Sequence, residues 1–205
     1  MKHIKMLGIA VVASLAVMGV AGVASASANA ILCSTNTNPC TGTKYGSGTK
    51  ISAQLKSGTH ATLTTSIANV TCTKSTVAGS TTNAEGHGEI STFTFSGCTS
   101  GSTPCTVKAV NLNYTATAKA SGGGNGTLTI SPKAGGGKPG ASVECGSLIN
   151  CTFTVSSITL GVTGGNPATI VANNETLERT GGLCPSTATW HATYEVTAPK
   201  PLFLV

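Results

Sequence analysis

Apolar and polar residues alternate with a period of two along most of the chain after residue 49, and this pattern limits the fold more than any other feature. Successive side chains of an extended strand point to opposite faces, so the alternation gives one buried face and one wet face. The inward positions of the predicted strands are Ile51, Ala53 and Leu55; Ala61, Leu63, Thr65 and Ile67; Phe93 and Phe95; Val110, Leu112, Tyr114, Ala116 and Ala118; Leu128 and Ile130; Phe153 and Val155; Ile158, Leu160 and Val162; and Trp190, Ala192, Tyr194 and Val196. Helical periodicity is absent from this part of the sequence.

Breaks rich in glycine and asparagine separate these runs, at residues 46–48, 83–88, 122–126, 135–137 and 164–167. Such residues suit turns that need a positive φ. A change of phase between Val155 and Ile158 predicts a β-bulge near Ser156 and Ser157. Nine or ten short strands separated by turns predict an all-β fold, namely an antiparallel β-sandwich or Greek-key barrel stapled by disulfides.

Residues 1–28 have the composition of a secretory signal peptide, with a basic start, an apolar run and a stretch of small residues. The alanines at 26, 28 and 30 offer two cleavage sites, which place the mature start at Asn29 or Ile31. An uncleaved membrane anchor is the alternative, because the apolar run approaches the length of a span. We expect no transmembrane segment in the mature chain. We predict that residues 29–48 form an N-terminal lasso and that residues 49–205 form a single β-sandwich domain.

All eight cysteines follow the leader, and an even number of cysteines in an exported chain predicts disulfides. The candidates are Cys33, Cys40, Cys72, Cys98, Cys105, Cys145, Cys151 and Cys184. Three short intervals favour the pairs Cys33–Cys40, Cys98–Cys105 and Cys145–Cys151, which leaves Cys72–Cys184; a rival scheme contains Cys72–Cys98 and Cys105–Cys184. A zinc site is the competing reading, but no CxxC pair exists and the histidines are dispersed. The cysteines and the leader together predict a secreted protein, extracellular or associated with the cell surface.

The charge balance argues against several partners. The chain has 12 Lys and Arg against 6 acidic residues, and 10 against 6 remain after the leader, spread singly. No nucleic-acid partner is expected, because basic residues do not cluster and aromatic residues make up only 4%. The chain has no Asp, the usual calcium ligand, and its six glutamates and few aromatic side chains do not suggest a glycosidase.

The histidines do not assemble an obvious catalyst. His191 and Glu195 share the outer face of a predicted strand but lie about 13 Å apart at strand rise, too far to touch. Glu85, His87 and Glu89 lie together in a glycine-containing turn that could bind a cation weakly, although an exposed hairpin tip explains them as well. Trp190 is predicted to belong to the core. We therefore assign no catalytic, cofactor-binding or metal-binding residue and expect no cofactor.

Several spacings resemble a group of secreted actinobacterial all-β proteins that contain cysteines and have no assigned activity. They are Cys33-x6-Cys40, Val70-x-Cys72, Phe93-Thr94-Phe95-x-x-Cys98, Gly164-Gly165-Asn166-Pro167-Ala168, and Leu183-Cys184-Pro185 followed by Ala188-x-Trp190-x-Ala192-x-Tyr194. These motifs consist of cysteines, turns and core residues, so the resemblance implies a scaffold. More distantly, the Val-x-Cys and Phe-x-Phe-Ser-Gly strands are similar to those of alkane-oxidation activator proteins, which implies association with cell surfaces and hydrophobic substrates.

We predict a secreted, non-enzymatic β-sandwich protein that acts as a surface-associated or binding module, with the cell surface or hydrophobic small molecules as partners. One alternative is a secreted hydrolase with an unrecognised site. Another is a carrier of small hydrophobic ligands, which would resemble the enediyne-binding apoproteins. Geometry discriminates among them, because an enzyme needs converging polar groups and a carrier needs a deep apolar cleft.

Overall fold

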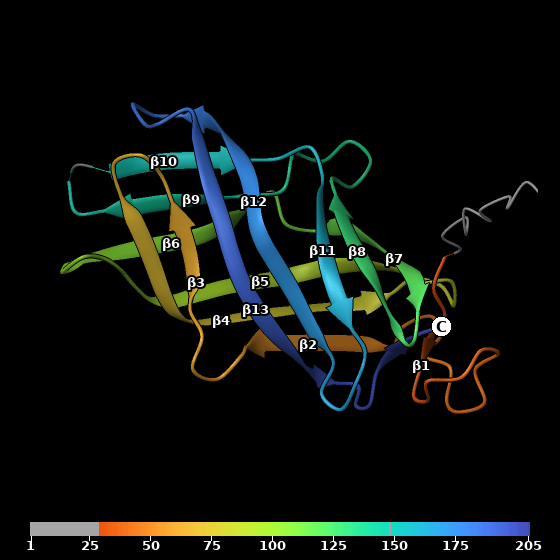
Figure 1. Ribbon diagram of the computed structural model, residues 1–205. Coiled ribbons are helices and arrows are strands. Elements are labelled where there is room, and N and C mark those ends of the chain that lie inside the picture. Colours follow the sequence, from red (N-terminus) through yellow and green to blue (C-terminus); the bar gives the residue numbers. More distant parts are fainter. Residues whose placement is uncertain (1–28, 148) are drawn as a thin grey trace, which may run out of the picture.

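The computed structural model describes residues 29–147 and 149–205, and the predicted leader lies outside them. The described residues form fourteen strands and no helix (Figure 1). The strands are β1 Leu32–Cys33, β2 Lys50–Leu55, β3 Ala61–Thr64, β4 Asn69–Thr81, β5 His87–Ser100, β6 Thr103–Val110, β7 Tyr114–Gly122, β8 Asn125–Ser131, β9 Gly140–Cys145, β10 Ile149–Thr154, β11 Ile158–Thr163, β12 Thr169–Gly181, β13 Thr187–Ala198 and β14 Phe203–Leu204.

Four long strands, β4, β5, β12 and β13, run through the whole molecule, and shorter strands complete it at each end (Figure 1). At one end the pairing runs β5-β7-β8-β11-β12-β13-β2-β4 and returns to β5. At the other end it runs β5-β6-β9-β10-β12-β13-β3-β4 and again returns to β5. Each end is therefore a closed ring of eight antiparallel strands, and the all-β prediction is confirmed.

The predicted alternation identifies the inner face correctly along most strands. On β13, Ala192, Tyr194 and Val196 are buried, and His191, which precedes them, is exposed. The predicted alternation extends too far at two connections, because Ile67 and Leu112 lie between strands and are exposed. The periodic pattern continues there, but the strand does not.

The shift in the alternation of inward-facing residues after Val155 has a different cause from the one predicted. The sequence suggested a bulge within one strand at Ser156 and Ser157. In the structure, β10 ends at Thr154 and β11 begins at Ile158. The chain here leaves the ring at one end of the molecule and enters the ring at the other, so the two runs need not share a phase.

The disulfides are Cys33–Cys40, Cys72–Cys98, Cys105–Cys145 and Cys151–Cys184. Of the favoured scheme only Cys33–Cys40 is correct; Cys98–Cys105, Cys145–Cys151 and Cys72–Cys184 are wrong. The rival scheme was correct for Cys72–Cys98 and wrong for Cys105–Cys184. No cysteine remains free. Four disulfides indicate an oxidising environment.

Strand register places the cysteines of two of these pairs face to face. Cys72, Cys98, Cys105 and Cys145 lie directly opposite one another in a row across β4, β5, β6 and β9. Cys145 lies opposite Ile149, two residues away from Cys151, so the short interval between these cysteines does not place them face to face.

The two ends of the described chain meet over one ring. β1 pairs with β14 in antiparallel fashion, and the backbone groups of Ile31 and Val205 exchange two hydrogen bonds of 2.7 and 3.0 Å. Leu32, Leu202 and Leu204 are buried against the inner face of β7, β11 and β13. We call this pair of strands, β1 and β14, the terminal cap. Among the described residues no helix is long and apolar enough to cross a membrane.

Candidate functional site: two apolar cavities inside the barrel

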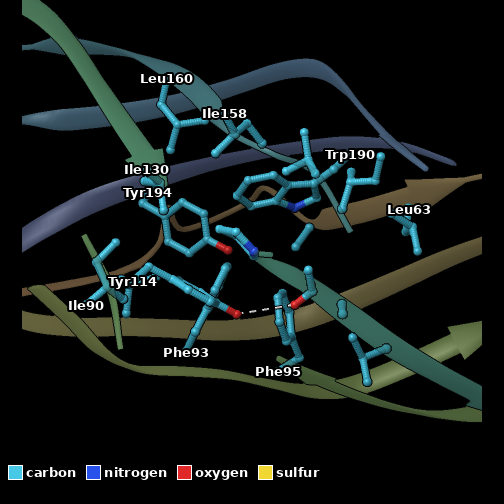
Figure 2. Close-up of a pocket in the computed structure, with 18 of the residues that line it drawn as sticks. Leu63, Ile90, Phe93, Phe95, Tyr114, Ile130, Ile158, Leu160, Trp190 and Tyr194 are labelled. Atoms are coloured by element: carbon cyan, nitrogen blue, oxygen red, sulfur yellow. Dashed lines mark hydrogen bonds between the residues drawn. The ribbon is translucent and has the colours of Figure 1, made fainter. Parts of the chain in front are cut away.

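The interior between the two rings contains a cavity of about 100 Å³. Five aromatic side chains border it, Phe93 and Phe95 from β5, Tyr114 from β7, and Trp190 and Tyr194 from β13. Figure 2 shows their rings around a common space, together with Ile130, Ile158 and Leu160. We call it the aromatic cavity.

The aromatic rings support one another. The Phe93 ring centroid lies 4.5 Å from that of Phe95, 5.9 Å from that of Trp190 and 6.1 Å from that of Tyr194. These tilted and edge-on contacts at 4.5–7 Å are favourable for aromatic pairs. Phe93, Phe95 and Trp190 are only half-buried although they face inward, because the cavity leaves part of their surfaces uncovered.

The polar atoms of the tyrosines are already paired. The hydroxyl oxygens of Tyr194 and Ser75 share a buried hydrogen bond of 2.9 Å. The Tyr114 hydroxyl donates to the carbonyl of Val110 and lies 3.5 Å from that of Gly140, the contact dashed in Figure 2. Burial raises the pKa of both tyrosine hydroxyls, and these hydrogen bonds oppose the rise. Both phenols therefore stay neutral at physiological pH.

One polar atom on this wall lacks a partner. The indole N–H of Trp190 is buried and makes no hydrogen bond to any residue that the structure describes. The surface facing the aromatic cavity is almost entirely apolar, so it suits an apolar molecule.

A second cavity of about 110 Å³ lies beside the first, beneath the terminal cap. Leu32, Leu202 and Leu204 come from the cap and its approach, and Val162 and Val196 come from β11 and β13. Residues 79–81 and 86–89, where β4 and β5 meet, complete the wall. Of the described residues that border this space, His87 is the single one with an aromatic side chain. We call it the aliphatic cavity.

The imidazole and one of the two carboxylates of residues 85–89 have separate partners. The His87 ring is held at 3.3 Å by the side chains of Asn29 and Thr117. The Glu89 carboxylate pairs instead with Lys133 at 3.1 Å, and Glu85 is exposed. Across residues 29–147 and 149–205 no three His, Cys, Asp or Glu side chains gather as metal ligands would.

The sequence placed Trp190 in the core but did not reveal the cavity beside it. A signal was present in the small inner residues, because Ala53 and Ala61 stand where larger side chains would fill the space. Alternation shows which side chains face inward. It does not show whether side chains from opposite walls meet.

No family model, curated protein or solved structure matches this chain. The function is therefore inferred from the site alone.

Proposed function

We propose that this chain is an exported, non-enzymatic binding protein that holds a small apolar molecule inside its barrel. The observation that carries the proposal is the aromatic cavity, whose wall is almost entirely carbon and whose tyrosine hydroxyls are already paired. Closed rings of eight strands have an interior just wide enough to be filled by side chains or to hold one small ligand. In this barrel the inward-facing side chains do not fill the interior completely.

The size of the cavity limits the ligand. Sites for drug-sized ligands span roughly 300–1,000 Å³, whereas the aromatic cavity has about 100 Å³. A molecule that consists of a single ring or a short branched chain is of the right size for this cavity. Transfer of such a molecule from water is favourable by about 25 cal/mol for each Å² of apolar surface removed from water.

We propose a non-enzymatic role because of where the ionisable side chains lie. His191 is exposed on the outside of β13, and the His87 ring and the Glu89 carboxylate each have other partners. A hydrolase with a site elsewhere is the weaker alternative, because a nucleophile needs a base within hydrogen-bond reach. Surface association stays a prediction from the sequence.

Export follows from the leader, and the structure favours one of its two cleavage sites. Ala30 is completely buried, and its N–H donates to the carbonyl of Ala118 at 3.1 Å. A mature chain that begins at Asn29 keeps this residue, whereas a chain that begins at Ile31 loses it. We propose cleavage between Ala28 and Asn29.

Trp190 provides the test, because it is the single tryptophan of the chain and borders the cavity. Toluene should change the emission of Trp190 in a saturable way when the purified, oxidised protein is titrated, and calorimetry should give the same affinity. Glycerol, which is no larger than toluene but carries a hydroxyl on every carbon, is the control and should produce neither signal. Absence of both signals up to the solubility of toluene would overturn the proposal.

A further inference from the structure

The aromatic and aliphatic cavities share a wall. Five residues line both of them, and each comes from a different strand: Ala53 of β2, Val77 of β4, Ile90 of β5, Leu128 of β8 and Ile170 of β12. A single layer of side chains therefore lies between the two spaces. We call these five residues the collar.

The collar is not tightly filled. Val77, Leu128 and Ile170 face inward but are only half-buried, in contrast to Ile90, which is 7% exposed. Inward-facing side chains in a closely packed interior are normally covered on all sides. The uncovered surface lies toward the two cavities, so free space continues along the collar on both sides.

The two spaces differ in the surfaces they present. Phe93, Phe95 and Trp190 offer ring faces and edges on one side of the collar. On the other side, the lining beneath the terminal cap is mainly aliphatic, with Leu202 and Leu204 at its far end. Rings pack well against rings, and a chain of methylenes packs well against branched aliphatic side chains.

The volumes of the two cavities also favour a ligand that occupies both of them. An engineered apolar cavity of about 150 Å³ in another protein takes up benzene. At about 100 and 110 Å³, each of the present cavities is smaller than that, and the two together are larger.

We propose that the two cavities form one elongated site for a ring that carries an unbranched alkyl chain, with the ring among Phe93, Phe95 and Trp190 and the chain passing the collar toward the terminal cap. This inference rests on the proposed function and specifies its ligand class.

Affinity across a homologous series tests it. Toluene, ethylbenzene, n-propylbenzene and n-butylbenzene are titrated into the oxidised protein, with Trp190 emission and calorimetry as readouts. Each added methylene should tighten binding about fourfold while the chain fills the aliphatic cavity, which corresponds to the burial of one CH₂.

Two variants on one strand provide matched controls. Val162 and Ile158 both face inward from β11, but Val162 lines only the aliphatic cavity and Ile158 only the aromatic cavity. Val162→Phe should leave the affinity for toluene unchanged and abolish the gain per methylene. Ile158→Phe should weaken every member of the series, toluene included.

The outcomes separate this inference from the proposed function. If toluene does not bind at all, the proposed function fails and the inference fails with it. If toluene binds but longer chains bind no better, or Val162→Phe keeps the gain per methylene, the inference alone is wrong.

A second measurement covers variants that do not fold. In wild-type protein, nuclear Overhauser contacts should join the ring protons of n-butylbenzene to Phe93 and Trp190. Contacts of the terminal methyl group should reach Leu202 or Leu204. A terminal methyl that contacts only residues of the aromatic cavity would contradict the proposal.

Discussion

The same substitution at two buried alanines should have opposite effects on stability. Ala53 of β2 and Ala192 of β13 belong to one core cluster and are 5% and 0% exposed. Ala53 lines both cavities, whereas Ala192 lines none of those found in the described residues. Only at Ala53 is there space for a larger side chain.

The magnitude follows from the volumes. An unfilled cavity costs about 24 cal/mol per Å³, so the aromatic cavity at about 100 Å³ costs about 2.4 kcal/mol. Ala53→Val adds two carbons, which contribute at most about 1.6 kcal/mol if both project into the space. The free energy of unfolding should rise by up to that amount, and Tm by about 3–6 °C. Ala192→Val has no space to enter and should cost about 1–3 kcal/mol through overpacking.

The assay is urea denaturation of both variants with the disulfides intact, supported by calorimetry. The toluene affinity of Ala53→Val should fall at the same time, because the added carbons occupy the ligand's space. A loss of stability in Ala53→Val equal to that in Ala192→Val would mean that the interior beside Ala53 is already full and that no cavity exists there.

Three further predictions concern the rest of the molecule. Replacing both cysteines of Cys151–Cys184 by alanine should lower the free energy of unfolding by about 3.7 kcal/mol, and the same change at Cys33–Cys40 should lower it by about 2.4 kcal/mol. The difference arises because the two disulfides close loops of 33 and 7 residues. Equal losses in urea denaturation would contradict the loop-closure argument. Intact mass of the exported protein should match a chain that begins at Asn29, and a mass that starts at Ile31 would overturn the proposed cleavage site. Burial raises the pKa of Tyr194, so this phenol ionises at a lower pH in the unfolded chain than in the folded one. The free energy of unfolding should therefore fall as pH rises above about 10, by up to about 1.4 kcal/mol per pH unit. Tyr194→Phe should make that fall shallower, and an unchanged slope would exclude this residue as a cause.

Local pattern was enough to predict the class of fold. The alternation on β13 is correct because one face of that strand meets the interior and the other meets water, so burial repeats every second residue. The same reasoning failed at Ile67, where the turn between β3 and β4 interrupts the strand although the period continues. The two-residue period identifies a possible strand, but the position of the turn determines where that strand ends.

The disulfides show why sequence distance is a poor guide in a sheet. Cys98 lies opposite both Cys72 and Cys105, so register alone allows either neighbour. The pair Cys105–Cys145 becomes visible only when β6 and β9 are known to be adjacent. That adjacency joins segments 40 residues apart and depends on closure of the whole ring.

The cavities were beyond sequence reasoning for a related reason. A run such as Trp190, Ala192 and Tyr194 gives the direction of each side chain along one strand. Whether Phe93 from β5 reaches the ring of Trp190 or leaves a gap depends on the width of the barrel, which the number of strands in the ring determines.

Xenon binding shows whether the barrel contains open apolar space, because apolar cavities in protein interiors take up this gas without any need for polar contacts. A crystal of the oxidised protein should be pressurised with xenon and its anomalous scattering recorded. A xenon site should appear among Phe93, Trp190 and Tyr194, inside the barrel. Xenon found only on the outer surface, with none in the interior, would contradict the presence of this open space.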